Sequence, residues 1–458
     1  MSLADATRDR LVALLGSRRA VSDPERLEPY GQDESGLGSY PPDAVALVES
    51  AAEVREVLSM AAMDRVPVTP RGLGTGMTGG ALPVQGGVVL CAERMARIKE
   101  IDRANLVAVV EPGVITGRLQ DAVEEEGLFY PPDPASLDSC SLGGNVAENA
   151  GGPRAFKYGV TREYVLGLEL TLMGGQTMRI GRRTVKGVTG LDLVALVVGS
   201  EGILGVVTEI TLKLLPRPQA VTAFIAQFRD PVSACEAVTA MIAGGHRPRT
   251  LELLDGHVLD HLRRAGGWPV PVEAGALLLV ELDGEAEALE GQMLAAADLC
   301  ERGGAVEISV ATDEARRRQM WEMRRNANPA LKEQHRFKVS EDIVVPRAAI
   351  PEMVRRLDRL AAEHDVLIAT FGHAGDGNLH VNVLCDDEQA LARVEPVLVG
   401  IIKHALDLGG TLSGEHGIGI AKRRFMELEQ PPDLLQLQRE LKRVFDPRGL
   451  LNPGKLLP

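Results

Sequence analysis

Aromatic side chains are scarce in this sequence of 458 residues, which has 8 Phe, 5 Tyr and 2 Trp. Proteins that bind single-stranded nucleic acid stack bases on such rings, so a site of that class is not expected. Positive charge is also in deficit, because the formal net charge is −14. That balance argues against nucleic acids and anionic membrane surfaces as partners. It does not exclude a small anionic substrate, since a site can be locally basic inside an acidic protein.

Cysteine is sparse as well. The five cysteines stand far apart and form no CxxC pair: Cys91, Cys140, Cys235, Cys300 and Cys385. Neither a ferredoxin-type iron–sulfur motif nor a zinc ribbon is therefore encoded. An odd number of cysteines without regular spacing is typical of a reduced, cytoplasmic protein, which is the location we expect.

Long apolar runs are missing too. The N-terminal residues lack the basic and apolar regions of a signal peptide, so we expect none. The run at 193–198 is interrupted by Gly199, Ser200 and Glu201, and no stretch reaches the roughly 18 to 20 residues that span a bilayer. We expect any membrane attachment to be made through a partner.

What is present is an ordinary globular composition, with 45% hydrophobic and 25% charged residues. A chain of this length predicts two or three domains. Pro216 and Pro218 mark a candidate boundary. After them, strand-like segments such as 223–228 and 276–282 alternate with alanine-rich helical segments such as 285–302, a pattern with α+β or α/β character.

The first of three glycine-rich elements is Gly74-Thr75-Gly76-Met77-Thr78-Gly79, which matches GxGxxG. A Rossmann site needs a helix directly after this loop. Here the expected helix, 52–64, precedes the loop, and Pro83 and Gly86 lead into another strand, so we reject that interpretation. Two others stay open: a nest of backbone N–H groups for a diphosphate, with Arg71 beside it, or a flexible surface loop.

Two further elements favour an extended ligand. One contains Gly143-Gly144-Asn145, Asn149 and Gly151-Gly152, and the other is the segment 198–205. Two glycine pairs eight residues apart are typical of two backbone approaches to one ligand.

Histidine is concentrated near the C-terminus. His373 and His380 flank a glycine-rich turn, and Glu415-His416 stands between Gly414 and Gly417. The alternation after the turn predicts a strand with His380 and Asn382 on one face. Two imidazoles and a carboxylate suit a divalent ion such as zinc or iron. His404 lies in a helical segment, IIKHALDLG, and we interpret it as structural.

Together, these elements resemble the FAD-binding domain of the vanillyl-alcohol-oxidase/p-cresol-methylhydroxylase superfamily. FGHAGDGNLHVNVL, SGEHGIGIAKRRF and FDPRGLLNPGK resemble the C-terminal domain of FAD-linked D-2-hydroxyacid dehydrogenases, such as those that oxidise glycolate, D-lactate or D-2-hydroxyglutarate. The resemblance implies an α+β fold: an FAD-binding domain of two α+β lobes over 1–217, a substrate or cap domain over 218–410, and a segment, 411–458, that returns to the FAD domain.

The resemblance also implies which residues hold FAD. The loop between Pro70 and Gly80 would line the pyrophosphate. The full implied set is Pro70, Arg71, Gly72, Gly74, Thr75, Gly76, Gly79, Pro132, Asp133, Ser139, Gly143, Gly144, Asn145, Asn149, Gly151, Gly152, Tyr158, Gly159, Glu201, Gly202, Ile203 and Asn452. The first loop has no His or Cys, and Cys140 is offset from the glycines that follow it, so we expect the FAD to be non-covalent.

For the chemistry, the resemblance implies His373, His380 and Glu415 as ligands of one divalent metal (zinc, manganese or iron) and His416 as the base. It implies Arg324, Lys338 and Asn382 as further catalytic or substrate-binding residues. A guanidinium suits a substrate carboxylate, although Arg324 stands among other arginines and a solvated helix charge is the alternative. The implied reaction moves a hydride from the 2-hydroxy acid to flavin N5.

Two alternatives stay open: an electron-transfer flavoprotein and a non-redox flavoprotein of the alkylglycerone-phosphate synthase type. A nicotinamide dehydrogenase depends on the GxGxxG interpretation discounted above, and a flavin absorbance spectrum would decide against it. For a dehydrogenase, we expect an external electron acceptor, either a quinone, a cytochrome, an electron-transfer flavoprotein or an iron–sulfur subunit. The sequence does not determine which hydroxy acid is the substrate or whether the protein forms a homodimer.

Overall fold

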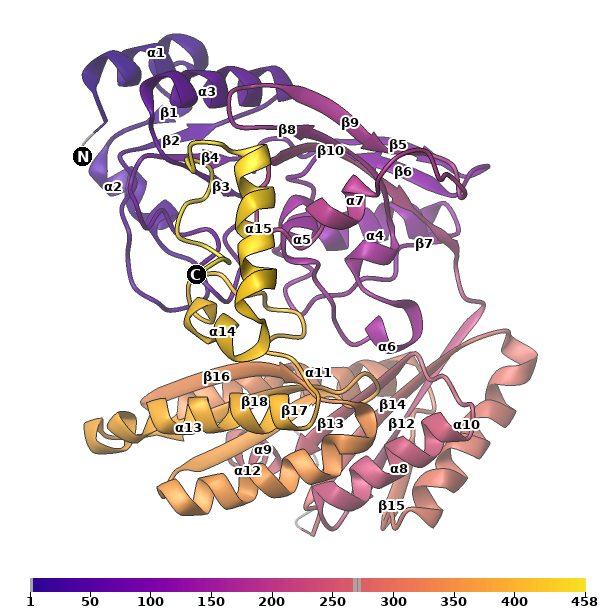
Figure 1. The fold of residues 1–458 in the computed structure, drawn as a ribbon. Coiled ribbons are helices and arrows are strands. Elements are labelled where there is room, and N and C mark those ends of the chain that lie inside the picture. The colour runs from indigo at the N-terminus through magenta and orange to yellow at the C-terminus, as the bar shows by residue number, and fades with distance from the viewer. Residues whose placement is uncertain (1–2, 267–269, 271–272) are drawn as a thin grey trace. The chain divides into compact units, whose positions relative to one another are not determined.

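The computed structural model describes residues 3–266, 270 and 273–458, and the chain forms two compact units (Figure 1). Unit 1 comprises Met1–Gly151, Val160–Arg217 and Glu415–Pro458, and unit 2 comprises Gly152–Gly159 and Pro218–Gly414. One passage between the units falls at Arg217, between the two prolines singled out above. The three-part division into 1–217, 218–410 and 411–458 stays a prediction about domains.

The first sheet of unit 1 is formed by four short strands in the order β1-β2-β4-β3. These are β1 (Ala20–Val21), β2 (Ala44–Leu47), β4 (Val88–Cys91) and β3 (Val68–Arg71). β2, β4 and β3 run parallel. The helices α1 (Asp5–Leu15) and α3 (Ala51–Asp64) supply Leu11, Val54 and Leu58 to the core beside this sheet. The helix expected at 52–64 is thus confirmed, and it precedes the glycine-rich loop.

The second sheet of unit 1 is antiparallel, with the order β5-β6-β10-β8-β9. Its strands are β5 (Ile98–Asp102), β6 (Val107–Val110), β10 (Val206–Lys213), β8 (Val165–Thr171) and β9 (Thr177–Gly181). The other elements of unit 1 are α2 (Pro24–Leu27), α4 (Thr116–Glu125), α5 (Leu142–Glu148), α7 (Leu193–Val197), α14 (Met426–Glu429) and α15 (Pro432–Phe445), with the pair β7 (Leu128–Phe129) and β11 (Leu215–Pro216).

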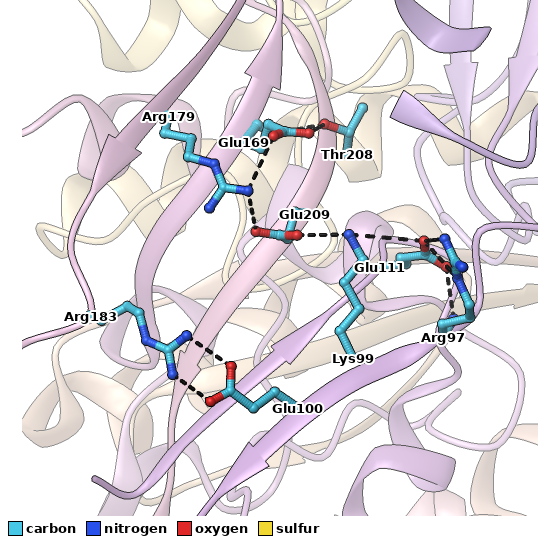
Figure 2. A network of polar contacts seen from close by, with 9 residues as sticks. All are labelled: Arg97, Lys99, Glu100, Glu111, Glu169, Arg179, Arg183, Thr208 and Glu209. Atoms are coloured by element: carbon cyan, nitrogen blue, oxygen red, sulfur yellow. Dashed lines mark hydrogen bonds and ion pairs between the residues drawn. The ribbon is translucent and has the colours of Figure 1, made fainter. Parts of the chain in front are cut away.

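Ion pairs cross the second sheet from strand to strand (Figure 2). Lys99 on β5 pairs with Glu209 on β10 at 2.7 Å, and Arg179 on β9 reaches the same carboxylate at 3.1 Å. Alternation along β10 leaves every second residue half-buried, so this face is polar by period. Opposite charges placed across neighbouring strands fix the register and stabilise the sheet modestly.

Unit 2 is built on a seven-stranded sheet with the order β15-β12-β14-β13-β17-β18-β16. The strands are β12 (Ala220–Phe228), β13 (Thr250–Asp255), β14 (Ala276–Gly284), β15 (Glu307–Val310), β16 (Phe337–Val344), β17 (Leu367–His373) and β18 (Asn378–Cys385). All neighbouring pairs are antiparallel. The strands expected at 223–228 and 276–282 are confirmed.

The two faces of this sheet differ. One face carries Leu251, Leu253, Val381 and Val383 against the helices α8 (Pro231–Ala243), α10 (Ala286–Arg302), α12 (Ile350–His364) and α13 (Glu388–Asp407), which lie along it in Figure 1. The other face packs partly on α9 (Gly256–Ala265) and α11 (Glu314–Gln334). The short helix α6 (Ala155–Tyr158) also belongs to unit 2.

Side-chain caps explain where the long helices begin. Asp230, Asp313 and Asp387 each accept a backbone N–H from the first turn of the helix that follows, which satisfies a donor that the helix itself cannot. The predicted α+β fold class is confirmed. Among the described residues, no helix is both long and apolar enough to cross a membrane.

Candidate functional site

In unit 1 the glycine-rich loop after β3 packs against the start of α5. A Cβ on Gly72 would collide with the Ser141 hydroxyl, so only glycine allows this approach. Ser141 Oγ also accepts a hydrogen bond from the backbone N–H of Gly144 at 3.3 Å. The first and second predicted cofactor elements therefore meet at this point, as two contacts on one extended ligand require.

Asn452 connects the third element to the first. Its Nδ2 donates to the carbonyl of Glu201 at 2.8 Å and to that of Gly80 at 3.1 Å. Its neighbour Leu451 bridges to Val68 of β3. The C-terminal segment thus closes the cradle made by the loops at 72–80 and 199–205.

The cradle has the chemistry that the diphosphate of FAD needs. Arg71 donates from Nη2 to the carbonyl of Pro29 at 3.3 Å, while its Nη1 is buried without a hydrogen-bond partner in the described part of the chain. A Cβ built on Gly76 would meet nothing within 4 Å, so this backbone is open to a ligand. A buried guanidinium nitrogen without a hydrogen-bond partner, beside exposed backbone, is what an anion would complete.

Other predicted cofactor residues hold the second element in shape. Asn145 donates to Thr116 Oγ1 at 2.7 Å, and the carbonyl of Pro132 accepts from Gln120 at 2.7 Å. Asn149 has a φ of +56° and accepts the backbone N–H of Arg162 at 2.9 Å. The segment 152–159 departs from this arrangement, because in unit 2 its Tyr158 hydroxyl donates to Asp283 at 2.8 Å.

The predicted base, His416, lies in unit 1 on a segment that is hydrogen-bonded to the predicted cofactor loops. Thr78 donates to the carbonyl of His416 at 3.1 Å. The carboxylate of Glu201 accepts the backbone N–H groups of Ile418 and Gly419, both at 2.7 Å. Sequence reasoning placed Thr78 in the loop between Pro70 and Gly80 but did not predict its contact with His416. His416 is therefore fixed by the same loops that are predicted to bind FAD.

Glu415 faces the second cofactor element. A Cβ on Gly151 would lie 3.0 Å from Glu415 Oε2, and Oε1 of the same carboxylate lies 3.8 Å from His416 Nε2. Nearby, burial raises the pKa of Glu148 well above its usual value, and the neighbouring Glu201 carboxylate raises it further. Unit 1 thus brings the predicted ligand, the predicted base and a flavin-loop glycine together.

The polar face of the unit 2 sheet carries the other predicted residues. Directly opposed residues on antiparallel strands point to the same face. Glu252 on β13 opposes His373 on β17, and His380 on β18 opposes Phe371 and Asp342 on its two neighbours. Alternation therefore lines up charged and imidazole side chains in the middle of the sheet.

The two histidines converge through their Nε2 atoms, which lie 3.4 Å apart, with the rings nearly perpendicular at 89°. His373 Nδ1 lies 2.6 Å from Glu252 Oε1. His380 Nδ1 lies 3.7 Å from Asp342 Oδ1. Because a carboxylate only accepts, Glu252 places the proton of His373 on Nδ1 and leaves the Nε2 lone pair directed toward His380.

This donor pair fits a divalent metal. Zn–N bonds of 2.0–2.1 Å put two imidazole ligands of a tetrahedral ion about 3.3 Å apart, which is close to the observed separation. A metal-binding histidine commonly donates its other ring N–H to a carboxylate. In the described part of unit 2, His373 and His380 supply the imidazole side of such a site.

Asp342 binds the segment of the chain that leads to Glu415. Its carboxylate accepts from Asn378 at 2.6 Å, from Ser413 at 2.8 Å and from the backbone N–H of Gly414 at 2.9 Å. Glu415 is the next residue along the chain. The predicted third ligand, Glu415, therefore directly follows Gly414, whose backbone is bound by Asp342, the cross-strand neighbour of His380.

Arg324, Lys338 and Asn382 also lie on this face. Arg324 donates from Nε to Glu252 Oε2 at 2.7 Å and stacks on the Phe371 ring at 4.6 Å, so it is not a solvated helix charge. Lys338 bonds to Ser340, which donates to Asn382 Oδ1 at 2.8 Å. Burial lowers the pKa of Lys338 to about 8.

Sequence reasoning missed Glu252 and gave Asp342 no role. Both are fully buried, and burial alone would raise the pKa of Glu252, yet His373 and Arg324 hold that pKa below its usual value. The available signal was a charged residue at an alternating position in the apolar run LELLD. A carboxylate placed there needs a partner, because an unpaired buried charge is costly.

Comparison with known proteins gives consistent matches. Residues 217–456 match the family model for FAD linked oxidases, C-terminal domain, and residues 42–181 match that for an FAD binding domain. The chain is 41% identical to glycolate oxidase subunit GlcD of Bacillus subtilis (strain 168), covering 95% of each chain. It is 34% identical to a D-lactate dehydrogenase of Anaerostipes hadrus, covering 96% of this chain and 95% of the relative.

Among solved structures, p-cresol methylhydroxylase with substrate bound matches with a TM-score of 0.81 at 18% identity, covering 98% of this chain and 96% of that chain. At this identity the likeness concerns the fold alone. The predicted fold of an FAD-binding domain with a C-terminal oxidase domain is confirmed.

Proposed function

Because the chain belongs to the FAD-linked oxidase family, we propose that it oxidises a D-2-hydroxy acid of the glycolate or D-lactate class to the 2-oxo acid. It is an FAD-linked oxidoreductase of the 2-hydroxyacid dehydrogenase or oxidase kind. The observation that carries the proposal is the buried His373–His380 pair beside Arg324. The two imidazoles can bind a metal ion, and the nearby guanidinium can bind the carboxylate of the substrate.

The cradle of unit 1 holds FAD without a covalent bond. Arg71 and the backbone of 72–80 bind the diphosphate, and the loops at 143–152 and 201–203 bind the rest, with Asn452 closing them. When bound, FAD supplies the acceptor for the two electrons that leave the substrate as a hydride. The proposal includes Gly152, Tyr158 and Gly159, whose segment groups with unit 2.

His373 and His380 hold one divalent metal, with Glu415 as the third protein ligand. When bound, this ion supplies Lewis acidity that lowers the pKa of the substrate hydroxyl. Glu252 orients the imidazole of His373, which leaves its Nε2 atom as a donor, and the Asp342 carboxylate lies 3.7 Å from Nδ1 of His380.

His416 is the base. An unprotonated ring nitrogen of its imidazole accepts the hydroxyl proton, and Thr78 and Glu201 fix the segment that carries it. Arg324 binds the substrate carboxylate with its terminal nitrogens, because its Nε is committed to Glu252. Lys338 and Asn382 complete the anion-binding face, with Ser340 between them.

Electrons leave to an external carrier, such as a quinone, a cytochrome, an electron-transfer flavoprotein or an iron–sulfur subunit. The five described cysteines are all buried as free thiols at separate positions, which does not suit a relay within the chain. Anaerobic mixing with NAD⁺ should leave the reduced flavin reduced, and reoxidation by NAD⁺ would contradict the proposal.

A substrate panel tests the proposal. Under anaerobic conditions, D-lactate or glycolate should bleach the flavin absorbance, and L-lactate should bleach it far more slowly. No bleaching by any 2-hydroxy acid, with flavin present, would favour the electron-transfer or non-redox flavoprotein instead.

The base assignment has its own test. His416→Ala should slow flavin reduction ~100- to 10,000-fold, the range that a positioned base contributes, while the flavin and metal contents stay at wild-type levels. A variant that reduces flavin at the wild-type rate would move the base to another residue.

A further inference from the structure

Glu252 touches two residues with different proposed tasks. Its Oε1 lies 2.6 Å from Nδ1 of His373, a proposed metal ligand, and its Oε2 accepts Nε of Arg324 at 2.7 Å. The side chain is fully buried. Each carboxylate oxygen thus contacts one partner. Because the side chain is buried, bulk water does not replace a contact that is lost.

The surroundings make this position rigid. Glu252 and His373 are direct cross-strand partners in the centre of the sheet. The Arg324 guanidinium lies on the Phe371 ring, and that ring packs on His380 with centroids 5.3 Å apart. A displaced Glu252 carboxylate therefore lengthens its contact with the imidazole of His373, with the guanidinium of Arg324, or with both.

Asp342, the carboxylate beside the other imidazole, is arranged differently. It accepts hydrogen bonds from Asn378, Ser413 and the Gly414 backbone, which are groups of the scaffold. Within the described residues, Glu252 is the carboxylate that joins a histidine of the pair to the arginine.

We propose that Glu252 is a positioning residue that couples metal binding at His373 to binding of the substrate carboxylate at Arg324. The inference rests on the proposed function, because it takes the roles of His373 and Arg324 from there. By linkage, a coupling of this kind is reciprocal: whatever orders one partner of Glu252 favours binding at the other.

Glu252→Gln is the informative change. The amide keeps the shape but has one acceptor oxygen and one donor nitrogen. If the oxygen faces His373, the amide N–H₂ faces the Nε–H of Arg324, and in the flipped amide it faces His373. The first orientation loses the hydrogen bond from Arg324. The flipped amide donates to His373 Nδ1, which moves the ring proton to Nε2 and removes the lone pair that would bind the metal.

The expected result has two parts. Metal affinity of the FAD-containing, metal-stripped protein, measured by calorimetry with Zn²⁺, should fall about 10- to 100-fold, the usual cost of losing an outer-sphere partner. KM for the hydroxy acid at saturating metal should rise about tenfold, since a hydrogen bond to a charged group is lost. The value of kcat at saturating metal and substrate should change less.

The matched control is Glu281→Gln. Glu281 is also a buried carboxylate on the same face, on the adjacent strand β14, and it accepts from Trp321 at 2.8 Å and pairs with Arg249 at 3.0 Å. It contacts neither histidine in the described structure. This variant should keep wild-type metal affinity and KM, and equal losses in both variants would overturn the inference.

Two further measurements separate this inference from the proposed function. Nitrogen-15 shifts of the His373 ring in the metal-free protein should report an Nδ1–H tautomer in the wild type and a mixture in Glu252→Gln. A double-mutant cycle that combines Glu252→Gln with Arg324→Lys should show non-additive effects on KM. Wild-type metal affinity, KM and tautomer in Glu252→Gln would overturn the inference and leave the function standing.

If the wild type itself takes up no metal, the metal assignment in the proposed function fails. The tautomer and the KM cycle then decide alone whether Glu252 positions both partners. Equal melting temperatures for wild type and Glu252→Gln establish that the variant is folded. If the variant melts early, Glu252→Asp keeps the charge but reaches one partner, and it should lose one of the two affinities.

Discussion

Unit 2 contains two pairs of histidines that meet through their Nε2 atoms, and they differ in what lies behind the rings. In the central pair, His373 and His380 are 3.4 Å apart with carboxylates behind both. In the outer pair, His261 and His335 are 2.8 Å apart. His261 Nδ1 lies 2.6 Å from the carbonyl of His257, and His335 Nδ1 lies 3.1 Å from the Asp386 carboxylate.

The two Nε2–Nε2 distances indicate different interactions between the rings. A separation of 2.8 Å is that of an N–H···N hydrogen bond, whereas 3.4 Å is too long for a good one. In the outer pair both Nδ1 atoms face hydrogen-bond acceptors, and the Nε2 atoms lie at hydrogen-bond distance from each other. The central pair leaves room for a metal ion instead. The Nε2 atoms of the central pair are thus 0.6 Å farther apart than those of the outer pair, and this difference supports placing the proposed metal at the central pair.

The largest effect should come from breaking the central pair. His380→Ala removes a proposed metal ligand, so we expect turnover to fall more than about 100-fold, beyond the loss caused by outer-sphere changes. FAD content should stay near wild type, because the cradle residues lie in unit 1. His335→Ala is the matched control and should keep activity within about twofold, measured with a dye acceptor. Equal losses in both variants would remove the distinction.

The next effect concerns the lysine on the same face as the central pair. Burial lowers the pKa of Lys338 to about 8, so its ammonium charge, which we propose attracts the substrate, is present below pH 8 and is lost above it. We expect kcat/KM to fall up to tenfold per pH unit above about pH 8.

Two variants sharpen this expectation. Lys338→Arg should hold kcat/KM level there, because a guanidinium stays charged. Lys332→Met should move the decline to higher pH, since the Lys332 charge also lowers the pKa of Lys338. A decline at the same pH in all three proteins would assign it to another group.

The outer pair should affect stability and not turnover. Burial lowers the pKa of His261 below its usual value, and the positive charges of His335 and Arg264 contribute. Below about pH 6.5 the unfolded chain binds a proton that folded His261 resists, so stability falls with acidification by up to ~1.4 kcal/mol per pH unit. His261→Gln should flatten this slope between pH 6.5 and 5 in urea unfolding, and an unchanged slope would assign the acid sensitivity to another group.

The smallest effect should come from ion pairs with no buried partner. Arg183 pairs with Glu100 at 2.8 Å in the network of Figure 2, and both side chains are nearly half exposed. Arg183→Met should leave the free energy of unfolding close to that of the wild type, and 1 M salt should abolish any difference. A larger change that survives salt would show that exposed pairs on this sheet are as consequential as the buried ones.

Much of the fold could be read from the sequence because it depends on local patterns. The helix at Ala51–Asp64 and the strand at Asn378–Cys385 follow from hydrophobic spacing, and both are present. The grouping of 152–159 with unit 2 could not be read, because it depends on Lys157 and Tyr158 reaching Asp283, more than a hundred residues away.

The candidate site divides in the same way. His373 and His380 stand out because glycines surround them in the sequence. Glu252 does not, since its importance arises from strand order: β13 lies next to β17 although over a hundred residues separate them. The pairing of distant strands is set by the whole core, and no local pattern encodes it.

The C-terminal segment of unit 1 has a consequence for biosynthesis. Leu451 bridges to β3, and Asn452 closes the loops at Gly80 and Glu201. Residues 218–414 leave the ribosome before these residues do, so unit 2 can fold while unit 1 is still incomplete. The segment that carries Leu451 and Asn452 therefore reaches its place beside β3 after unit 2 has been synthesised, which makes completion of the proposed cofactor cradle a late event.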